Sequence, residues 1–435
     1  MFLHPRLRLR ETRTFYNQLR ALANVQKLES MSLDDVREKQ SRMLRCAISH
    51  AYRNVPHYKR IFDDLRISPG DIKSVDDLHK IPILTKEQVL AGYPHQITSR
   101  TFPLKSAFKS ASSGTSGVRG TYLTDWATRD SNFALLYRSR SLFGYRPNHL
   151  EFRFSWWPQR SHRWFHRVGF QRWISTSIRD PPKDNVAKML GSRPQSILGS
   201  PSYLNLMSTM IADRKNVDME PILVLSTGEV MDAEMRDSIS RAFNAPAVDM
   251  YGCAEQNFIA TECPEEGNLH LNILNAIIEV SPDGGESARE ERGEILITQL
   301  TNTVMPLIRY SLGDVGKIGE DECNCGRHGH ILSKLEGRKD DLLRTMDGRE
   351  IPGELARSAV TIPGIRGYMI FQEKVDHIVI KVISDDLNIG LREAIIGEIR
   401  RILGNPETMV DLIPVEKIEP DTSGKRRLVI SKVNN

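Results

Sequence analysis

The chain has 435 residues, of which 40% are hydrophobic and 26% are charged, and its formal net charge is +5. This balance is typical of a globular protein and excludes a disordered or fibrous chain, and the length predicts two or three domains. The small positive charge would draw anionic small molecules to a cleft, but it does not indicate a nucleic-acid partner.

Targeting signals are absent from the sequence pattern. No run of about 18 apolar residues occurs, so no membrane span is expected. The stretch MFLHPRLRLRETRTFY is basic and lacks the apolar segment of a secretory signal, and a solvated helix is favoured there over an amphipathic helix on a membrane surface. Five Cys without such a signal favour a reducing compartment over a disulfide framework. We therefore expect a cytoplasmic protein.

Helices are expected over most of residues 1–100. The stretch LDDVREKQSRMLRCAISHAYRNV starts with acidic residues and carries apolar residues at helical spacing, namely Val36, Met43, Leu44, Ile48 and Ala51. Thr85, after Pro82, is the expected N-cap of the next helix.

Strand and helix patterns alternate between residues 110 and 330. PILVLST, AIIEVSP and GEILITQL predict strands, and DAEMRDSISRAF predicts a helix with one apolar face. Alternation of this kind predicts an α/β architecture.

The pattern changes after about residue 338. HIVIKVISDD, LREAIIGEIRRIL and MVDLIPVEKI predict a strand, a helix and a strand, and the charged stretch LEGRKDDLLRT is expected to link two domains. We therefore predict an α/β fold with a large N-terminal domain of mixed sheets and helices, residues 1–338, and a small α+β domain, residues 339–435.

The loop SASSGTSGVRGTYLT, residues 110–124, is rich in small hydrogen-bond donors. Gly114 and Gly117 allow positive φ and inward-turned N–H groups. Neighbouring hydroxyls and the Arg119 guanidinium could donate to phosphate oxygens. The loop lacks the G-K-[ST] of a Walker motif, and by itself it is equally compatible with a Ser/Gly-rich surface loop.

Two later segments place Gly and acidic residues after predicted strands, where α/β sheets bind ligands. STGEVMD contains Gly228 and Glu229, and VDMYGCAEQ contains Tyr251, Gly252 and Glu255. Tyr251 is either a satisfied core tyrosine or a ring stacked on a purine, with Gly252 permitting close approach.

Three further segments complete the set, although each is weak by itself. LIRYSLGDVGKI places Asp314 in a Gly-flanked turn, from which a carboxylate can accept hydrogen bonds from ribose hydroxyls. The other two segments are EGRKDD, residues 336–341, and TSGKRR, residues 422–427.

The order and spacing of these segments resemble the adenylate-forming superfamily, and most closely its phenylacetate–CoA ligase family. ISHAYRNVPHYKRIFDD and IPILTKEQV extend the resemblance over nearly the whole chain. The resemblance implies an AMP-forming acyl-CoA ligase that uses ATP, Mg and CoA. The alternatives are an adenylating enzyme that passes the acyl group to an amine or a carrier protein in polysaccharide or natural-product biosynthesis, and a non-catalytic nucleotide-binding paralogue.

The resemblance also assigns roles by matching position. The phosphates would be held by Ser113, Gly114, Thr115, Ser116 and Gly117, and the adenine would be framed by Gly228, Glu229, Asp249, Tyr251 and Gly252. Glu255 would bind magnesium, Asp314 and Arg338 would hold the ribose, Asp340 would be the hinge, and Lys425 would bridge the two substrates.

The phosphate loop departs from the family pattern at one place. Family loops usually have Lys and Pro after the second Gly, whereas this chain has Val118, Arg119 and Gly120. Arg119 could supply the cation one position later, which makes it the third candidate catalytic residue beside Lys425 and Glu255.

Two separated pairs of soft ligands suggest a metal site. Cys263 and His270 lie in CPEEGNLH, and Cys323 and Cys325 lie in ECNCGRHGH. They suit a tetrahedral Cys3His zinc site, which we favour over four unrelated residues. His328 and His330 are alternative ligands.

Four of the five Trp fall in FSWWPQRSHRWFHRVGFQRW, residues 154–173. These aromatic side chains could line a pocket for an aromatic acid, although core packing is favoured. The expected partners are a carboxylic acid and CoA or another acyl acceptor. A homodimer is a further possible assembly. Neither the acid nor the oligomeric state follows from the sequence.

Overall fold

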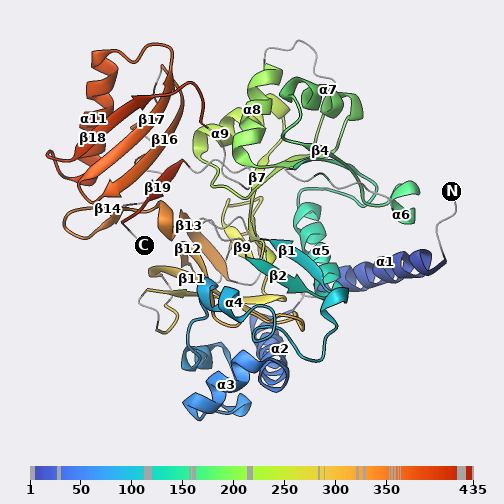
Figure 1. Ribbon diagram of the computed structural model, residues 1–435. Helices are drawn as coiled ribbons and strands as arrows, with labels where there is room; N and C mark the ends of the chain where they lie inside the picture. The colour runs from blue at the N-terminus through green and yellow to red at the C-terminus, as the bar shows by residue number, and fades with distance from the viewer. Residues whose placement is uncertain are drawn as a thin grey trace. The chain divides into compact units, whose positions relative to one another are not determined.

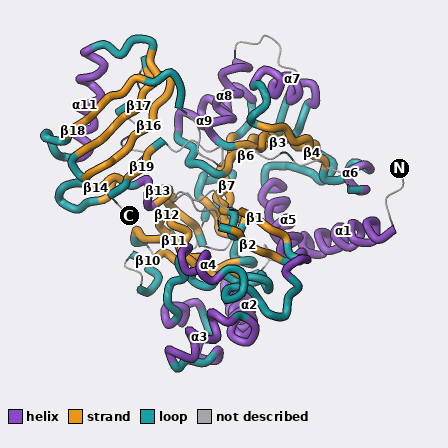
Figure 2. Tube along the Cα trace, viewed as in Figure 1, coloured by secondary structure: helices purple, strands orange, loops and turns teal. Residues whose placement is uncertain are grey.

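The computed structural model describes the chain as two compact units (Figures 1 and 2). Unit 1 comprises residues 1–312 and 317–334, and unit 2 comprises residues 313–316 and 335–435. The described residues are all except 1–4, 27–30, 112–119, 156–157, 159–162, 213–218, 283–284, 289, 320–322, 327–329, 352, 354–355, 357–358, 361, 363, 419–427 and 434–435.

The stretch LEGRKDDLLRT, expected as a polar linker, is instead ordered secondary structure. It contains the end of β13 (Ile331–Arg338), the 3-10 helix η5 (Lys339–Asp341) and β14 (Leu343–Arg344). Leu342 and Leu343 are fully buried, and this burial of apolar area anchors a segment that its charges alone would leave in solvent. The two compact units divide after Lys334, whereas the predicted boundary follows residue 338.

The predicted N-terminal helices are confirmed. They are α1 (Pro5–Gln26), α2 (Leu33–Asn54), α3 (Pro56–Leu65), η2 (Pro69–Asp71), η3 (Val75–Lys80), α4 (Lys86–Gly92) and η4 (Leu104–Ser106). Val36, Leu44, Ile48 and Ala51 form the buried face of α2 as expected, whereas Met43 is only half-buried. The N-cap of α4 is Thr85, whose hydroxyl accepts from the Gln88 amide in a capping box.

The described residues of unit 1 form two sheets. The hairpin pairs β1 (Phe108–Ala111) with β2 (Thr121–Thr124). An eleven-stranded sheet of described residues runs in the order β10-β11-β12-β13-β9-β8-β7-β6-β5-β3-β4. Besides β13, its strands are β3 (Leu150–Ser155), β4 (Arg172–Ser177), β5 (Ser196–Gly199), β6 (Leu223–Thr227), β7 (Ala247–Cys253), β8 (Asn257–Glu262), β9 (Leu269–Leu271), β10 (Ala276–Ser281), β11 (Arg292–Gln299) and β12 (Tyr310–Ile318).

The stretch from β7 to β4 is parallel, and helices cover both of its faces. On one face α7 (Pro182–Ser192), α8 (Pro201–Ala212) and α9 (Ala233–Phe243) share a core with β3, β5 and β6. On the other face α5 (Trp126–Ser141) packs through Leu136 on β6 and β7. Burial on both faces explains why β6 is a continuous apolar run. The short helix α6 (Trp164–Arg167) precedes β4.

Unit 2 has the predicted α+β composition. Its four-stranded sheet has the order β18-β17-β16-β19, and α11 (Ile389–Leu403) packs on it through Ile395, Ile399 and Leu403, which recur every four residues. The strands are β15 (Glu350–Ile351), β16 (Ile365–Lys374), β17 (His377–Ser384), β18 (Met409–Pro414) and β19 (Val429–Ser431), with β15 pairing β14.

The helical N-terminal region is tied to the large sheet by Arg309, which is 1% exposed. Its guanidinium pairs with Glu279 of β10 at 3.1 Å and donates to the carbonyl of Ile81 at 2.8 Å. Burial raises the pKa of Glu279, and the Arg309 charge opposes that rise. The carboxylate therefore depends on its cation to remain ionised in the core.

We expect Arg309→Met to lower the free energy of unfolding by about 3–5 kcal/mol, because it leaves a buried carboxylate without its cation. Adding Glu279→Leu should recover part of that loss, since the unpaired charge is then removed. Urea denaturation of the full chain, monitored by tryptophan fluorescence, measures the free energy of unfolding of the single and the double variant. A single variant as stable as the wild type would contradict this role for Arg309.

Candidate functional site

The carboxyl ends of β6 and β7 carry two of the predicted nucleotide-binding segments. Gly228 follows β6 with φ +91°, a left-handed conformation that favours glycine. One carboxylate oxygen of Glu229 accepts from the backbone N–H of Ser202 at 3.2 Å. Glu229 therefore helps to cap the first turn of α8. A contact with adenine, as predicted, would be made in addition to this hydrogen bond.

The close packing of the protein's own backbone requires a glycine at Gly252. A Cβ at this position would lie 2.0 Å from the carbonyl oxygen of Asn257 on the paired strand β8, and the register shifts between Tyr251 and Gly252. The glycine therefore permits a close approach of two backbones at a bulge, whereas the sequence suggested close approach of a ligand. The Tyr251 side chain is 8% exposed.

Asp249 of β7 lies beside a second carboxylate that the sequence did not single out. Glu262 of β8 accepts from the Asp249 backbone N–H at 2.7 Å and pairs with Arg236 at 2.9 Å. Burial, and then the charge of Glu262, raise the pKa of Asp249 to about 6. The predicted adenine-binding carboxylate is thus held in a position that disfavours its charge.

We expect Asp249→Asn to stabilise the fold by about 1–2 kcal/mol at pH 8, after allowance for the partial exposure of this group. The pKa is higher in the folded state, so ionisation of Asp249 costs folding free energy as the pH rises from 3.8 through about 6. The gain should therefore shrink below pH 5. Thermal melting of both proteins from pH 4 to pH 8 measures it, and a pH-independent difference would contradict the interpretation.

Glu255 lies in the turn after β7 and is 8% exposed. Its Oε1 accepts from the Tyr310 hydroxyl at 3.4 Å, and that hydroxyl lies 2.9 Å from the hydroxyl of Tyr122. The sequence motifs point to Glu255 but not to either tyrosine. Each of them lies within a segment that was selected, since Tyr122 is in SASSGTSGVRGTYLT and Tyr310 precedes Asp314 by four positions in LIRYSLGDVGKI.

The predicted phosphate loop lies outside the described residues, and so do its Ser113, Gly114, Thr115, Ser116, Gly117 and Arg119. The two strands that flank it are described. The hairpin β1–β2 brings Ala111 opposite Thr121, and Ser110 of β1 donates to the carbonyl of Ala254 at 2.8 Å. The base of the loop is therefore fixed next to the turn that carries Glu255.

In unit 2 the two predicted ribose ligands come together. Nη1 of Arg338 lies 3.7 Å from Oδ1 of Asp314. Asp340, the predicted hinge, lies in η5, and its side chain is outside the described residues. Lys425 also lies outside them.

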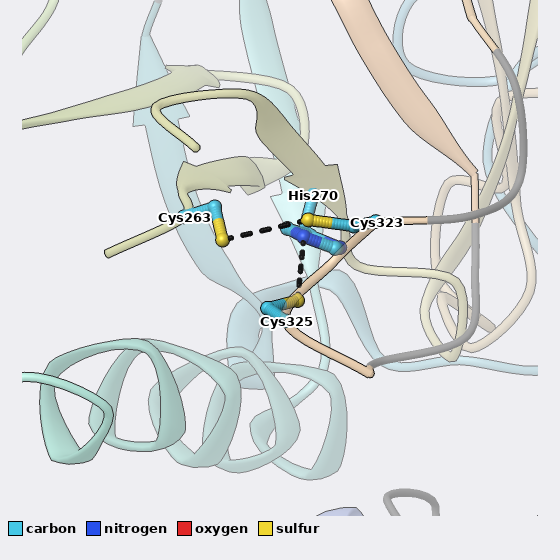
Figure 3. A group of neighbouring side chains, drawn as sticks. All are labelled: Cys263, His270, Cys323 and Cys325. Atoms are coloured by element: carbon cyan, nitrogen blue, oxygen red, sulfur yellow. Dashed lines mark hydrogen bonds between the residues drawn. The ribbon is translucent and has the colours of Figure 1, made fainter. Parts of the chain in front are cut away.

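The four predicted zinc ligands meet in unit 1 and point toward one another (Figure 3). Cys263 follows β8, His270 lies on β9, and Cys323 and Cys325 lie between β12 and β13. Their ligand atoms all lie within 4.8 Å of one another. His330 is not part of this group, and His328 lies outside the described residues.

The spacing of these atoms fits a tetrahedral zinc ion. With Zn–S of about 2.3 Å and Zn–N of about 2.1 Å, the edges of the tetrahedron would be roughly 3.8 Å for S···S and 3.6 Å for S···N. The Sγ atoms of Cys263 and Cys323 are 3.7 Å apart, and Sγ of Cys325 lies 3.4 Å from Nε2 of His270. The donor set is soft and closed, as structural zinc sites are.

Among the described aromatic side chains of residues 154–173, Phe154 and Phe165 are buried, and Trp164, Phe170 and Trp173 are half-buried. The ring centroids of Trp164, Phe165 and Phe170 lie 5.0–5.4 Å from that of Phe15 on α1. These ring contacts agree with the expectation that the aromatic side chains of this segment pack against the protein and do not line a pocket for an aromatic acid. Two of its tryptophans, Trp156 and Trp157, lie outside the described residues.

Comparison with known proteins adds sequence relatives and a structural neighbour. No protein-family model matches the chain. The chain is 26% identical to a phenylacetate-coenzyme A ligase of Aromatoleum evansii, over 94% of this chain and 97% of the relative. It is 28% identical to the enzyme of the same name in Escherichia coli strain K12, over 77% and 78%.

Among solved structures, 2-hydroxyisobutyryl-CoA ligase in the postadenylation state aligns with a TM-score of 0.77 at 19% identity, over 93% of this chain and 91% of that chain. The chain has the fold of this structure. The fold class and the resemblance to phenylacetate–CoA ligases that the motifs indicate are thus confirmed. None of the described helices is both long and apolar enough to cross a membrane.

Proposed function

We propose that the protein activates a carboxylic acid with ATP through an acyl-adenylate and then transfers the acyl group to CoA. Its curated relatives are named phenylacetate-coenzyme A ligases, and its structural neighbour was solved with an acyl-adenylate. The observation that carries the proposal is the position of Gly228 directly after β6 and of Glu255 in the turn after β7, at the carboxyl ends of two paired parallel strands, where α/β sheets bind nucleotides.

The residue types suit this chemistry. Attack of a carboxylate on the α-phosphorus of ATP brings two anions together and needs no protein nucleophile, so the protein must align the reactants and place positive charge near them. Bound Mg²⁺ would neutralise phosphate charge, and Glu255 is the carboxylate that would hold it. Arg119 and Lys425 are the proposed cations of the chain.

Transfer to CoA requires a different lining of the same pocket. We expect unit 2 to turn about Asp340 between the two half-reactions, because a hinged small domain can present two faces to one site. Asp314 and Arg338, already adjacent, would hold the ribose. Zinc at Cys263, His270, Cys323 and Cys325 would have a structural role.

Carboxylate-dependent exchange of labelled pyrophosphate into ATP tests the adenylation step, and CoA consumption tests the transfer. We expect both activities with a suitable acid from a panel of aromatic and short aliphatic acids. Exchange without CoA consumption would favour an amine or a carrier protein as the acceptor. Absence of exchange with every acid, in a folded protein, would favour a non-catalytic nucleotide-binding protein.

Lys425→Ala should lower pyrophosphate exchange by about a hundredfold, because it removes a positive charge from the transition state of adenylation. Hydrolysis of a supplied acyl-adenylate, or its transfer to CoA, should change much less. Single-turnover assays of the two half-reactions separate these effects. Unchanged exchange in the variant would show that the assigned role is wrong.

A further inference from the structure

Three buried side chains form a hydrogen-bonded chain that ends on Glu255. Tyr122 and Tyr310 are each 2% exposed, and their hydroxyls are 2.9 Å apart. The Tyr310 hydroxyl lies 3.4 Å from Oε1 of Glu255. The three residues come from β2, β12 and the turn after β7, so only the folded chain brings them together.

The donor and the acceptor in each of these two hydrogen bonds can be assigned, starting from Glu255. A carboxylate can only accept. The Tyr310 hydroxyl is therefore the donor to Oε1 of Glu255. Because Tyr310 directs its single proton to Glu255, the Tyr122 hydroxyl donates to Tyr310.

Other groups hold the main chain around Glu255. Nε2 of Gln299 donates to the Glu255 carbonyl at 2.8 Å, and the Ser110 hydroxyl donates to the Ala254 carbonyl at 2.8 Å. Within the described part of the chain, Oε1 is the carboxylate oxygen of Glu255 that accepts a hydrogen bond. Backbone and side chain are thus fixed from opposite ends, and Oε2 is left for a ligand.

We propose that Tyr310 is a positioning residue that holds Oε1 of Glu255, so that Oε2 stays available to the divalent cation that accompanies ATP. Tyr122 fixes the Tyr310 hydroxyl. Because Tyr122 lies on β2, directly after the predicted phosphate loop, the same contacts connect the exit of that loop to the metal-binding carboxylate. The inference rests on the proposed function.

Tyr310→Phe removes the hydroxyl and keeps the ring. Isothermal titration calorimetry of the full chain uses two probes, ATP with excess Mg²⁺ and AMP without metal. We expect the Kd for Mg-ATP to rise about tenfold, which corresponds to about 1.4 kcal/mol, while the Kd for AMP stays within about twofold. The Mg²⁺ concentration for half-maximal pyrophosphate exchange should rise by a similar factor.

Two more variants make the test specific. Tyr122→Phe leaves the Tyr310 hydroxyl in place and should weaken Mg-ATP about threefold, and it decides the question if Tyr310→Phe does not fold. Tyr145→Phe is the matched control, because Tyr145 is 4% exposed and its hydroxyl donates to the carbonyl of His149. It should change neither Kd. Circular dichroism and thermal melting establish that each variant is folded.

Each contrary outcome has a distinct meaning. Equal weakening of AMP and Mg-ATP in the tyrosine variants would show that they only shape the pocket, and unchanged binding of both probes would show no role; either result overturns the inference alone. A wild-type chain without Mg²⁺-dependent ATP binding would overturn the proposed function, and this inference with it.

Discussion

Replacing Glu255 by Gln is expected to lower carboxylate-dependent pyrophosphate exchange by about a hundredfold or more. The amide has nearly the volume of the carboxylate, and its oxygen can still accept the hydrogen bond from Tyr310. What it loses is the negative charge, which makes a carboxylate a stronger ligand for a divalent cation than a neutral amide oxygen. The exchange rate, measured across a range of Mg²⁺ concentrations, should remain low even at saturating metal.

Glu398→Gln is the control for this change. Glu398 is a half-exposed carboxylate on α11 that pairs with the exposed Arg401, and ion pairs at the surface contribute little. This variant should keep wild-type exchange. If Glu255→Gln is folded and retains exchange within a few-fold of the wild type, Glu255 does not bind the catalytic metal.

Cys323→Ser is expected to abolish stoichiometric zinc binding. Protein purified without chelator should contain about one zinc per chain, because four soft ligands already lie at tetrahedral spacing. Loss of one thiolate should reduce that content to a small fraction. It should also lower the free energy of unfolding by several kcal/mol, because bound zinc would pin β8 and β9 to the segment between β12 and β13.

Metal analysis and thermal melting of the wild type, Cys323→Ser and Cys46→Ser test this prediction. Cys46 is an exposed free cysteine on α2 and is not part of the cluster, so its variant should keep both the zinc and the melting temperature. Less than about half an equivalent of zinc in the wild type would count against the site. So would a Cys323→Ser protein with undiminished zinc.

Apolar patterns along the chain predicted helices and strands correctly where the apolar residues of the pattern are the ones that become buried. The apolar run at Leu223–Thr227 became a strand buried on both faces, and the apolar face of Leu33–Asn54 packs as expected. The stretch LEGRKDDLLRT, predicted as a polar linker, begins where the two compact units divide, but it also contains the buried pair Leu342 and Leu343. Charge content alone does not reveal which two residues in such a segment will be covered.

The residue types also marked constrained positions, but they did not show which contact imposes the constraint. Gly252 was selected as a place of close approach, but the partner is the backbone of Asn257. Glu229 was selected as an adenine neighbour, but its carboxylate also caps α8 at Ser202. A motif identifies a constrained position, and only the contacts say which constraint acts.

The sequence by itself determined the order of helices and strands, the candidate carboxylates and the two pairs of soft ligands, because these depend on neighbours along the chain. The tertiary structure decided which of them meet. Tyr122 and Tyr310 are 188 positions apart, and Cys263 and Cys323 are 60 apart. Contacts at such separations arise when strands pair and helices cover the sheet, and no local spacing encodes them.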